Sequence, residues 1–256
     1  MAKSDVVTVD RDGPVRIVTL NRPNEMNAFS DELHAAFPRV WHAIEHDAEA
    51  RAVVLTGAGR AFSAGGSIDD FDLFRTNFAA RRQTLRDARR LVDEMLNVHV
   101  PVVAAVNGPA VGLGCTLMTL CDVVFIADDA FVADPHVSVA LVAGDGGAVT
   151  WPFLTSMLKV KRYLLTGDRI PAAEAVAMGL ANEVVPDGRV VEEALAFAHR
   201  LAAQPPQAVQ DTKALLNQPL REAAARLMGF GLAAESQSHD TPEYRAVPEQ
   251  FRSRKT

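Results

Sequence analysis

Short apolar runs that end in glycine-rich turns recur in the first half of the chain. Residues 52–56 (AVVLT) end at Gly57, residues 101–106 (PVVAAV) end at an Asn-Gly-Pro turn, and residues 122–127 (DVVFIA) form a third run. Uninterrupted runs of this length are typical of strands buried on both faces. Helical patterns follow the first two runs. The pattern therefore predicts α/β architecture, with functional groups on the turns that follow strands.

The remaining pattern divides the chain into a mixed region and a helical one. Ser30 precedes two acidic residues, which marks a helix start, and the helix it begins contains Pro38. We expect a core at residues 1–188 and a C-terminal helical region at residues 189–256. The other expected elements are strands at 6–9, 15–20, 131–133 and 182–185, helices at 30–46, 79–97 and 112–120, and helices after residue 151 that are interrupted at 186–188, 205–206 and 242.

Composition narrows the function classes. The 256-residue chain is 48% hydrophobic, which allows one sizeable core, and its net charge is −6. An acidic chain argues against sequence-independent nucleic-acid binding, which needs basic surfaces. No apolar run approaches the roughly 20 residues of a membrane span, and the first ten residues lack the apolar run of a signal peptide. Cys115 and Cys121 form neither a metal-ligand spacing nor a disulfide framework, so we expect a soluble cytoplasmic protein without a metal.

Two glycine-rich turns are candidates for binding an anion through the backbone, at residues 64–66 (AGG) and 112–114 (GLG). Glycine at a helix start leaves free N–H groups that can face an anion, and two such turns can converge on one oxyanion. Taken alone, this pattern favours the interpretation of ordinary turn glycines. The chain contains neither a G-x-G-x-x-G fingerprint after a strand nor a phosphate loop nor a G-x-S-x-G nucleophile elbow.

Three histidines share one face of the helix expected at residues 30–46. His34, His42 and His46 are spaced by eight and four residues. A metal site is conceivable, but no acidic partner is suitably placed in the pattern, so a solvated helix face is the favoured interpretation.

A basic stripe lies on the helix expected at residues 79–97. It consists of Arg81, Arg82, Arg86, Arg89 and Arg90. A solvated helix face explains it most simply, and contact with an anionic ligand such as a nucleotide phosphate is the functional alternative.

His136 and Asp145 bound a loop that follows the strand at 131–133. A histidine with an orienting carboxylate can act as a general base. A histidine that caps the loop and an aspartate that binds turn amides form the structural alternative.

Five segments, in this order, resemble the crotonase superfamily, also called the enoyl-CoA hydratase/isomerase family. No single segment is specific, but five in the family's order are, and they cover nearly the whole chain. The segments are residues 20–30 (LNRPNEMNAFS), 53–70 (VVLTGAGRAFSAGGSIDD), 101–127 (PVVAAVNGPAVGLGCTLMTLCDVVFIA), 131–147 (FVADPHVSVALVAGDGG) and 163–186 (YLLTGDRIPAAEAVAMGLANEVVP).

The resemblance implies a fold and an assembly. The fold is a crotonase-like spiral of ββα repeats with a C-terminal helical region, and family members form trimers that often pair into hexamers. Apolar positions after residue 205 exceed what a short appendage can bury by itself, which supports assembly through this region. These positions are Leu215, Leu216, Leu227, Met228, Phe230 and Leu232.

The resemblance also implies an acyl-CoA substrate, with coenzyme A as part of the substrate and no permanently bound cofactor. In the family two backbone N–H groups hold the thioester oxygen, and here these belong to Ala64 and Leu113. Removing one such donor costs on the order of 3 kcal/mol of transition-state stabilisation. The adenine of coenzyme A is expected near residues 67–70. The substrate-binding residues carried over are Gly65, Gly66, Ser67, Ile68, Gly112 and Gly114.

The chain departs from the hydratase pattern at two positions. Enoyl-CoA hydratases carry two glutamates that handle the water, and here Thr116 and His136 stand in their places. A threonine can position water but is a poor general base. The loop at residues 135–152 instead resembles that of 6-oxocamphor hydrolase, a superfamily member that cleaves a C–C bond in β-diketones. The histidine, aspartate and glutamate of that enzyme match His136, Asp145 and Glu235.

Three functions compete on these observations. An acyl-CoA lyase or isomerase is the leading hypothesis, a C–C bond hydrolase of β-dicarbonyl compounds is the second, and a non-catalytic binding protein is the third. The acidic charge disfavours RNA binding. We predict that His136, Asp145, Glu235 and Thr116 carry the catalytic side chains. Asp145 is expected to bind one nitrogen of His136 and leave the other nitrogen free as the base.

Overall fold

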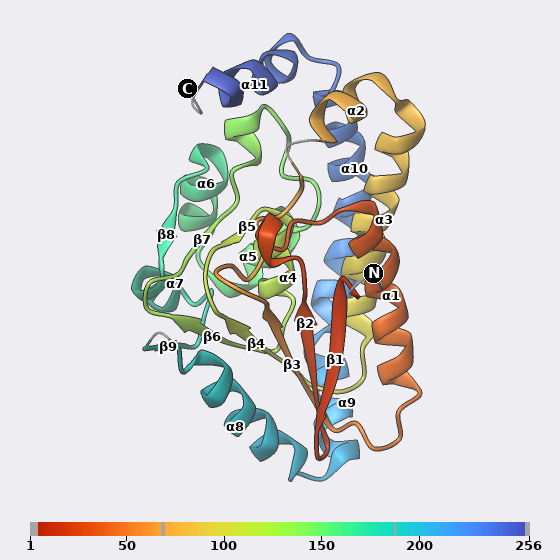
Figure 1. Ribbon diagram of the computed structural model, residues 1–256, viewed down its shortest axis with the longest axis vertical. Coiled ribbons are helices and arrows are strands. Elements are labelled where there is room, and N and C mark those ends of the chain that lie inside the picture. Colours follow the sequence, from red (N-terminus) through yellow and green to blue (C-terminus); the bar gives the residue numbers. More distant parts are fainter. Residues whose placement is uncertain (1–4, 68–69, 187, 254–256) are drawn as a thin grey trace.

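The computed structural model describes residues 5–67, 70–186 and 188–253, and its centre is a six-stranded sheet (Figure 1). The strand order is β1-β2-β3-β4-β6-β9, in which β1 and β2 are antiparallel and all other neighbours are parallel. The apolar runs of β3 and β4 are buried at every position, as predicted. The strands are β1 Val7–Asp12, β2 Val15–Leu20, β3 Ala52–Gly57, β4 Val102–Val106, β6 Val123–Ala127 and β9 Glu183–Val185.

A second, three-stranded sheet lies beside the start of α4. It consists of β5 (Ala110–Val111), β7 (Phe131–Ala133) and β8 (Ile170–Pro171) in the order β5-β7-β8. Strands of two residues are too short to show a hydrophobic period, which is why β5 and β8 were not predicted. This small sheet brings the turn before α4 next to the segment that follows β7.

The helices follow the predicted pattern closely. Ser30 caps α1, where its Oγ accepts a hydrogen bond from Leu33 N, and the predicted breaks near Pro206 and Pro242 separate α8 from α9 and α10 from α11. Proline is tolerated at these starts because the first N–H groups of a helix have no partner. The helices are α1 Asp31–Glu45, α2 Phe71–Thr76, α3 Phe78–Asn97, α4 Leu113–Thr119, α5 Gly147–Leu154, α6 Met157–Thr166, α7 Ala172–Met178, α8 Val190–Ala202, α9 Pro206–Leu216, α10 Gln218–Ser238 and α11 Pro242–Ser253, with 3-10 turns at η1 Pro23–Glu25 and η3 His136–Val139.

The C-terminal helices pack against the sheet and against one another (Figure 1). α8 lies on β3 and β4, while α10 packs against α3, which in turn packs against α1. Buried Lys213 on α9 donates to Asp122 Oδ2 at 2.7 Å and to Val100 O at 2.9 Å. The helical region after residue 188 is therefore tied to the core, and the division at this residue stays a prediction. In the described ranges, no helix has the length and apolarity of a bilayer span.

Candidate active site

The two glycine-rich turns lie against each other, as the sequence predicted. Ser63 pairs with Ala110 in an isolated parallel bridge, and Val111 N donates to Ser63 O at 2.9 Å. A Cβ on Gly65 would lie 2.4 Å from Val111 O, and one on Gly114 would lie 2.5 Å from Ser63 O. Only glycine permits so close an approach of two backbones. Gly65 and Gly114 therefore act by bringing the turns together.

The free backbone donors differ in part from the prediction. Leu113 is the first residue of α4, so its N–H has no acceptor within the helix. Ala64 N–H, by contrast, donates to Met26 O at 2.9 Å, which leaves it unavailable to an oxyanion and corrects its expected role. Gly66, two residues later, lines the same cavity as Leu113, and among the described residues neither N–H has a hydrogen-bond acceptor.

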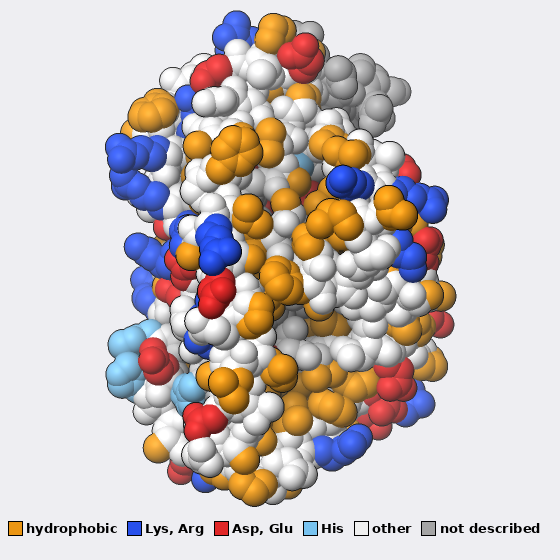
Figure 2. All heavy atoms as spheres, turned by 180° about the vertical axis from the view of Figure 1, so that it is seen from behind, with side chains coloured by type: hydrophobic (Ala, Val, Ile, Leu, Met, Phe, Trp, Pro, Cys, Tyr) orange, Lys and Arg blue, Asp and Glu red, His pale blue; other side chains and the backbone are white. Residues whose placement is uncertain are grey.

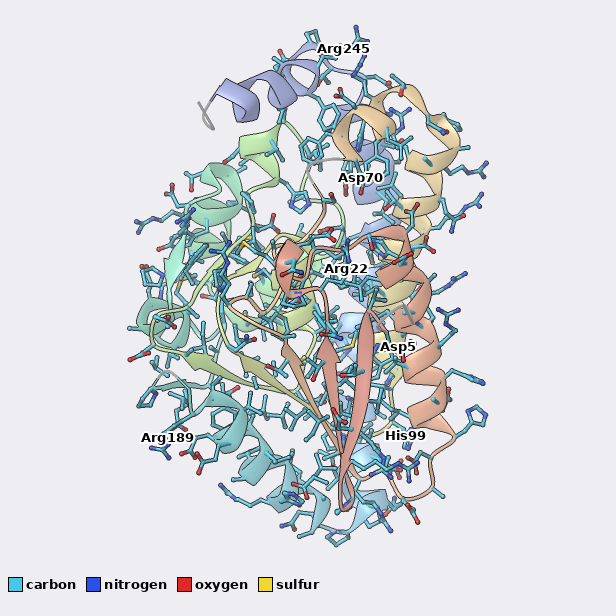
Figure 3. The ribbon with its side chains drawn as sticks, in the orientation of Figure 1. Asp5, Arg22, Asp70, His99, Arg189 and Arg245 are labelled. Carbon is cyan, nitrogen blue, oxygen red and sulfur yellow. The ribbon has the colours of Figure 1, made fainter. Side chains whose placement is uncertain are left out.

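A cavity of about 570 Å³ opens beside these turns. Three of the predicted substrate-binding residues line it, namely Gly66, Ser67 and Gly112, whereas Ile68 falls outside the described residues. Asp70, labelled in Figure 3 just before α2, also lines it. The other walls include Phe29, His34, Phe71, Phe74, Leu85, Pro135, His136, Val139, Leu141, Asp145, Arg169, Glu235, His239 and Tyr244.

Four buried titratable side chains lie close together beside this cavity, and three of them line it. Asp134 follows β7, His136 begins η3, Asp145 precedes α5, and Glu235 lies on α10. His136 Nδ1 is hydrogen-bonded to Asp134 Oδ1, and His136 Nε2 lies 3.4 Å from Asp145 Oδ2. A Cβ on Gly112 would lie 3.8 Å from His136 Cε1, so the cluster adjoins the start of α4.

The cluster shifts the proton affinities of its members. Burial by itself would lower the pKa of His136, but the charges and hydrogen bonds of Asp134 and Asp145 outweigh it and raise that pKa well above the usual value. Burial, assisted by the charge of Asp145, raises the pKa of Glu235 to about 8. At neutral pH the carboxyl group of Glu235 therefore carries a proton.

The pair predicted from the sequence is together in space, but its arrangement differs from the prediction. His136 and Asp145 are close, and Glu235 joins them. The prediction that one nitrogen of His136 remains free is wrong, because Asp134 occupies the nitrogen opposite Asp145. Asp134 was not among the site residues predicted from the sequence. The sequence signal for it is its position, two residues before the histidine and directly after a strand.

Thr116 does not reach the cavity. Its side chain is fully buried, it is not among the lining residues, and its Oγ1 has no hydrogen-bond partner in the described part of the chain. A Cβ on Gly146 would lie 2.3 Å from Thr116 Cγ2, so this side chain packs against the turn before α5. The geometry corrects its expected catalytic role to one of packing.

The three histidines of α1 also differ in their burial and in their position relative to the cavity. His34 is buried, lines the cavity and packs on the Phe29 ring at 5.1 Å between centroids, so its interpretation as a solvated residue is wrong. Burial lowers its pKa, so it is neutral near pH 7.

His42 and His46 are exposed, and Glu45 brings its carboxylate within 4.8 Å of both ring-nitrogen ligand atoms. Among the described residues this surface trio is the one group with metal-ligand spacing, and it lies outside the cavity.

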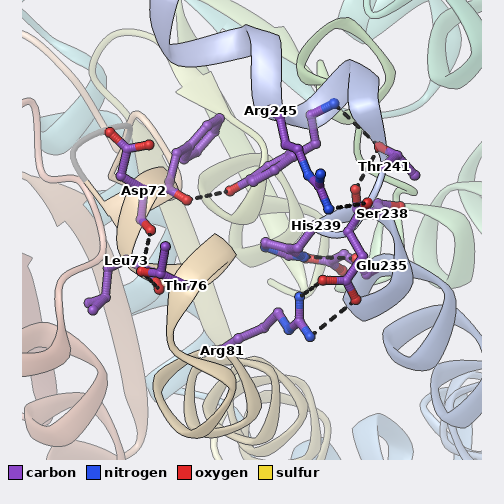
Figure 4. A network of polar contacts seen from close by, with 12 residues as sticks. Asp72, Leu73, Thr76, Arg81, Glu235, Ser238, His239, Thr241 and Arg245 are labelled. Carbon is purple, nitrogen blue, oxygen red and sulfur yellow. Dashed lines mark hydrogen bonds and ion pairs between the residues drawn. The ribbon is translucent and has the colours of Figure 1, made fainter.

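The arginines of the basic stripe on α3 likewise differ in their burial and in their contacts. Arg81 is buried and donates to Asp240 Oδ1 at 3.0 Å and Oδ2 at 3.3 Å, beside His239 at the end of α10 (Figure 4). Arg81 thus joins α3 to the turn that follows α10 and is not available to a phosphate. Arg82 and Arg86 are exposed and keep that prediction open.

A stability measurement tests the protonation of Glu235. Because the folded-state pKa of about 8 lies above the usual 4.5, the unfolded chain loses this proton first, and stability falls as pH rises from about 4.5 to 8. Glu235→Gln removes this penalty. We expect the free energy of unfolding of the variant, relative to the wild type, to rise between pH 5 and 8 by on the order of 3 kcal/mol in urea titrations. A difference that is constant with pH would contradict the assignment.

Two backbone N–H groups without an acceptor among the described residues, those of Gly66 and Leu113, thus line the same cavity as a buried cluster of titratable side chains. A sequence model of the enoyl-CoA hydratase/isomerase family matches residues 10–251, and the chain belongs to this family.

Known proteins agree with this membership. The chain is 33% identical over 218 residues to the short-chain-enoyl-CoA hydratase of Clostridium acetobutylicum, covering 84% of this chain and 82% of the relative. It is 33% identical over 232 residues to the 2,3-dehydroadipyl-CoA hydratase of Escherichia coli, covering 90% and 87%. An enoyl-CoA hydratase/isomerase structure from Mycobacterium paratuberculosis is similar with a TM-score of 0.92 and 47% identity over 98% of this chain and all of that one.

Proposed function

We propose that this enzyme binds an acyl-CoA thioester and stabilises the thioester oxygen as an enolate-like oxyanion. The N–H groups of Leu113 and Gly66 are the proposed donors, because both line the cavity and neither has an acceptor among the described residues. Gly66 replaces Ala64 in this role. The supporting observation is that the start of α4 adjoins His136, so donors and acid–base groups face one ligand.

The buried cluster supplies the proton transfers in this proposal. Asp145 and His136 provide charge at one side of the bound acyl group, and the carboxyl group of Glu235 is protonated at neutral pH and can donate. Backbone donors hold the oxygen while a proton moves at the neighbouring carbon. Coenzyme A enters only as part of the substrate, and no permanent cofactor is required.

Substrate identification is the direct test. The purified protein is incubated with a panel of enoyl-CoA esters and cyclic β-diketones, and the products are identified by mass. The proposal is supported if the protein turns over a CoA ester and does not turn over the same acyl group without coenzyme A. Hydrolysis of free diketones without coenzyme A would instead establish the C–C hydrolase, which the His136, Asp145 and Glu235 grouping keeps as the second candidate. No turnover by a folded protein would favour the non-catalytic binder.

Assembly through the C-terminal helices is part of the proposal. Four large apolar side chains on α9 and α10 are more than half exposed, whereas Met228 is buried and Leu232 partly buried. Hydrophobic side chains gather on the face shown in Figure 2. The four exposed residues are Leu215, Leu216, Leu227 and Phe230.

Exposed apolar groups of this number are costly in a monomer. We expect light scattering at micromolar concentration to give the mass of three or six chains, and the mass of one chain would contradict this expectation. A cytoplasmic location also stays a prediction.

A further inference from the structure

The carboxylate of Asp134 is almost completely buried and lies against the histidine of the cluster. Its Oδ1 is hydrogen-bonded to His136 Nδ1, and its Oδ2 faces Gly147, the first residue of α5. A Cβ on Gly147 would lie 2.1 Å from that oxygen, so only glycine makes room for the carboxylate. The first turn of a helix favours negative charge, and Oδ2 has no hydrogen-bond partner among the described residues.

Both nitrogens of His136 face carboxylate oxygens. A neutral imidazole has a single N–H, and an ionised carboxylate can only accept. The imidazolium is the one form that presents a proton to Asp134 and to Asp145 at the same time. We propose that Asp134 is a positioning residue that holds His136 as a doubly protonated imidazolium, and that Asp145, not His136, is the base of the cavity.

The other contacts of Asp145 fit this assignment. Its Oδ1 is buried, has no hydrogen-bond partner among the described residues, and belongs to a residue that lines the cavity. Its other oxygen, Oδ2, lies 3.4 Å from His136 Nε2. Asp145 accepts one proton through Oδ1 and Glu235 donates one, so the total charge of the cluster is unchanged, and transfer of a proton from Asp145 to Glu235 then restores the starting state. The titratable groups around His136 are Asp134 after β7, Asp145 before α5, Glu235 on α10, Cys115 on α4 and, through Asp145, His34 on α1.

Nitrogen NMR of ¹⁵N-histidine-labelled protein tests the protonation state without any substrate. In the wild type we expect His136, identified by its loss in His136→Asn, to show two imidazolium nitrogens at pH 7.5. Asp134→Asn keeps the side-chain shape and removes the charge. It should lower the titration midpoint of His136 by about 1–3 pH units, as removal of an adjacent opposite charge does. A neutral His136 in the wild type at pH 7.5 overturns the proposal, even if the variant does not fold.

An exposed pair in the same chain provides the matched control. His199 Nε2 lies 3.0 Å from Asp12 Oδ2, and both side chains are at least 40% exposed. Asp12→Asn removes an equal charge far from the cluster and should leave the His136 signals in place, because water screens exposed charges. A shift of His136 in this control would mean that the readout reports general charge and not the contact with Asp134.

The kinetic consequence rests on the proposed function. Once a substrate is known, the kinetic limb of kcat/KM that coincides with the NMR midpoint of His136 in the wild type, and not the limb of Glu235 near pH 8, should move in Asp134→Asn by the same number of pH units as that midpoint. A limb that does not move with the midpoint would overturn the assignment of Asp145 as the base. Absence of turnover on every CoA ester would refute the proposed function and leave the NMR result to decide the state of His136.

Discussion

Replacing Leu113 with proline is expected to lower kcat/KM by about 10²–10³-fold, the usual cost of losing one oxyanion donor. Proline lacks the N–H but suits the first position of a helix, where Leu113 lies, so α4 should persist. The preceding Gly112 has φ +53° and ψ −122°, the mirror image of the extended backbone that residues before proline prefer, and this conformation is open to glycine. The measurement is steady-state kinetics on the substrate found in the panel.

Leu113→Ala is the matched control, because it removes the side chain and keeps the N–H. It should lose no more than about tenfold through poorer packing. Circular dichroism and binding of a non-reactive acyl-CoA analogue should be retained by both variants, since uniform binding does not depend on the oxyanion. Equal losses in the proline and alanine variants would contradict the assignment of this donor.

Asp145→Asn is expected to lower kcat by about 10²–10⁴-fold, as loss of an acid–base group does. The variant keeps the side-chain size and removes the charge that faces His136 Nε2. Because the charge of Asp145 helps to raise the pKa of Glu235, that pKa should also fall, and any kinetic limb near pH 8 should move to lower pH.

Asp168→Asn provides the control for this change. Asp168 is exposed and lies between Gly167 and Arg169, which line the cavity, so it alters the net charge near the site without touching the cluster. It should retain activity within about threefold, the usual scale of an exposed charge. An Asp145→Asn variant as active as this control would exclude Asp145 from catalysis and direct attention to Glu235.

The amino-acid sequence by itself determined the architecture and the helix start at Leu113, where a backbone N–H is left without an acceptor inside the helix. Buried strands such as β3 and β4 are apolar at almost every position, and Ser30 and Pro206 mark helix starts, so these elements could be predicted from local chemistry. The family resemblance likewise rested on motifs that are contiguous in the chain. His136 and Asp145 were predicted as a pair because Asp145 follows nine positions after His136 on a glycine-rich loop.

Only the tertiary structure decided how the site is arranged. A hydrogen-bond acceptor at Met26 occupies Ala64 N–H, and the packing of Gly146 turns Thr116 away from the cavity. Neither contact has a local sequence signal, because each joins segments at least 30 residues apart. The same holds for Glu235, which reaches the cluster from α10. Asp134 is close in sequence to His136, but its direction depends on the end of β7 and on the space left by Gly147, and both are products of packing.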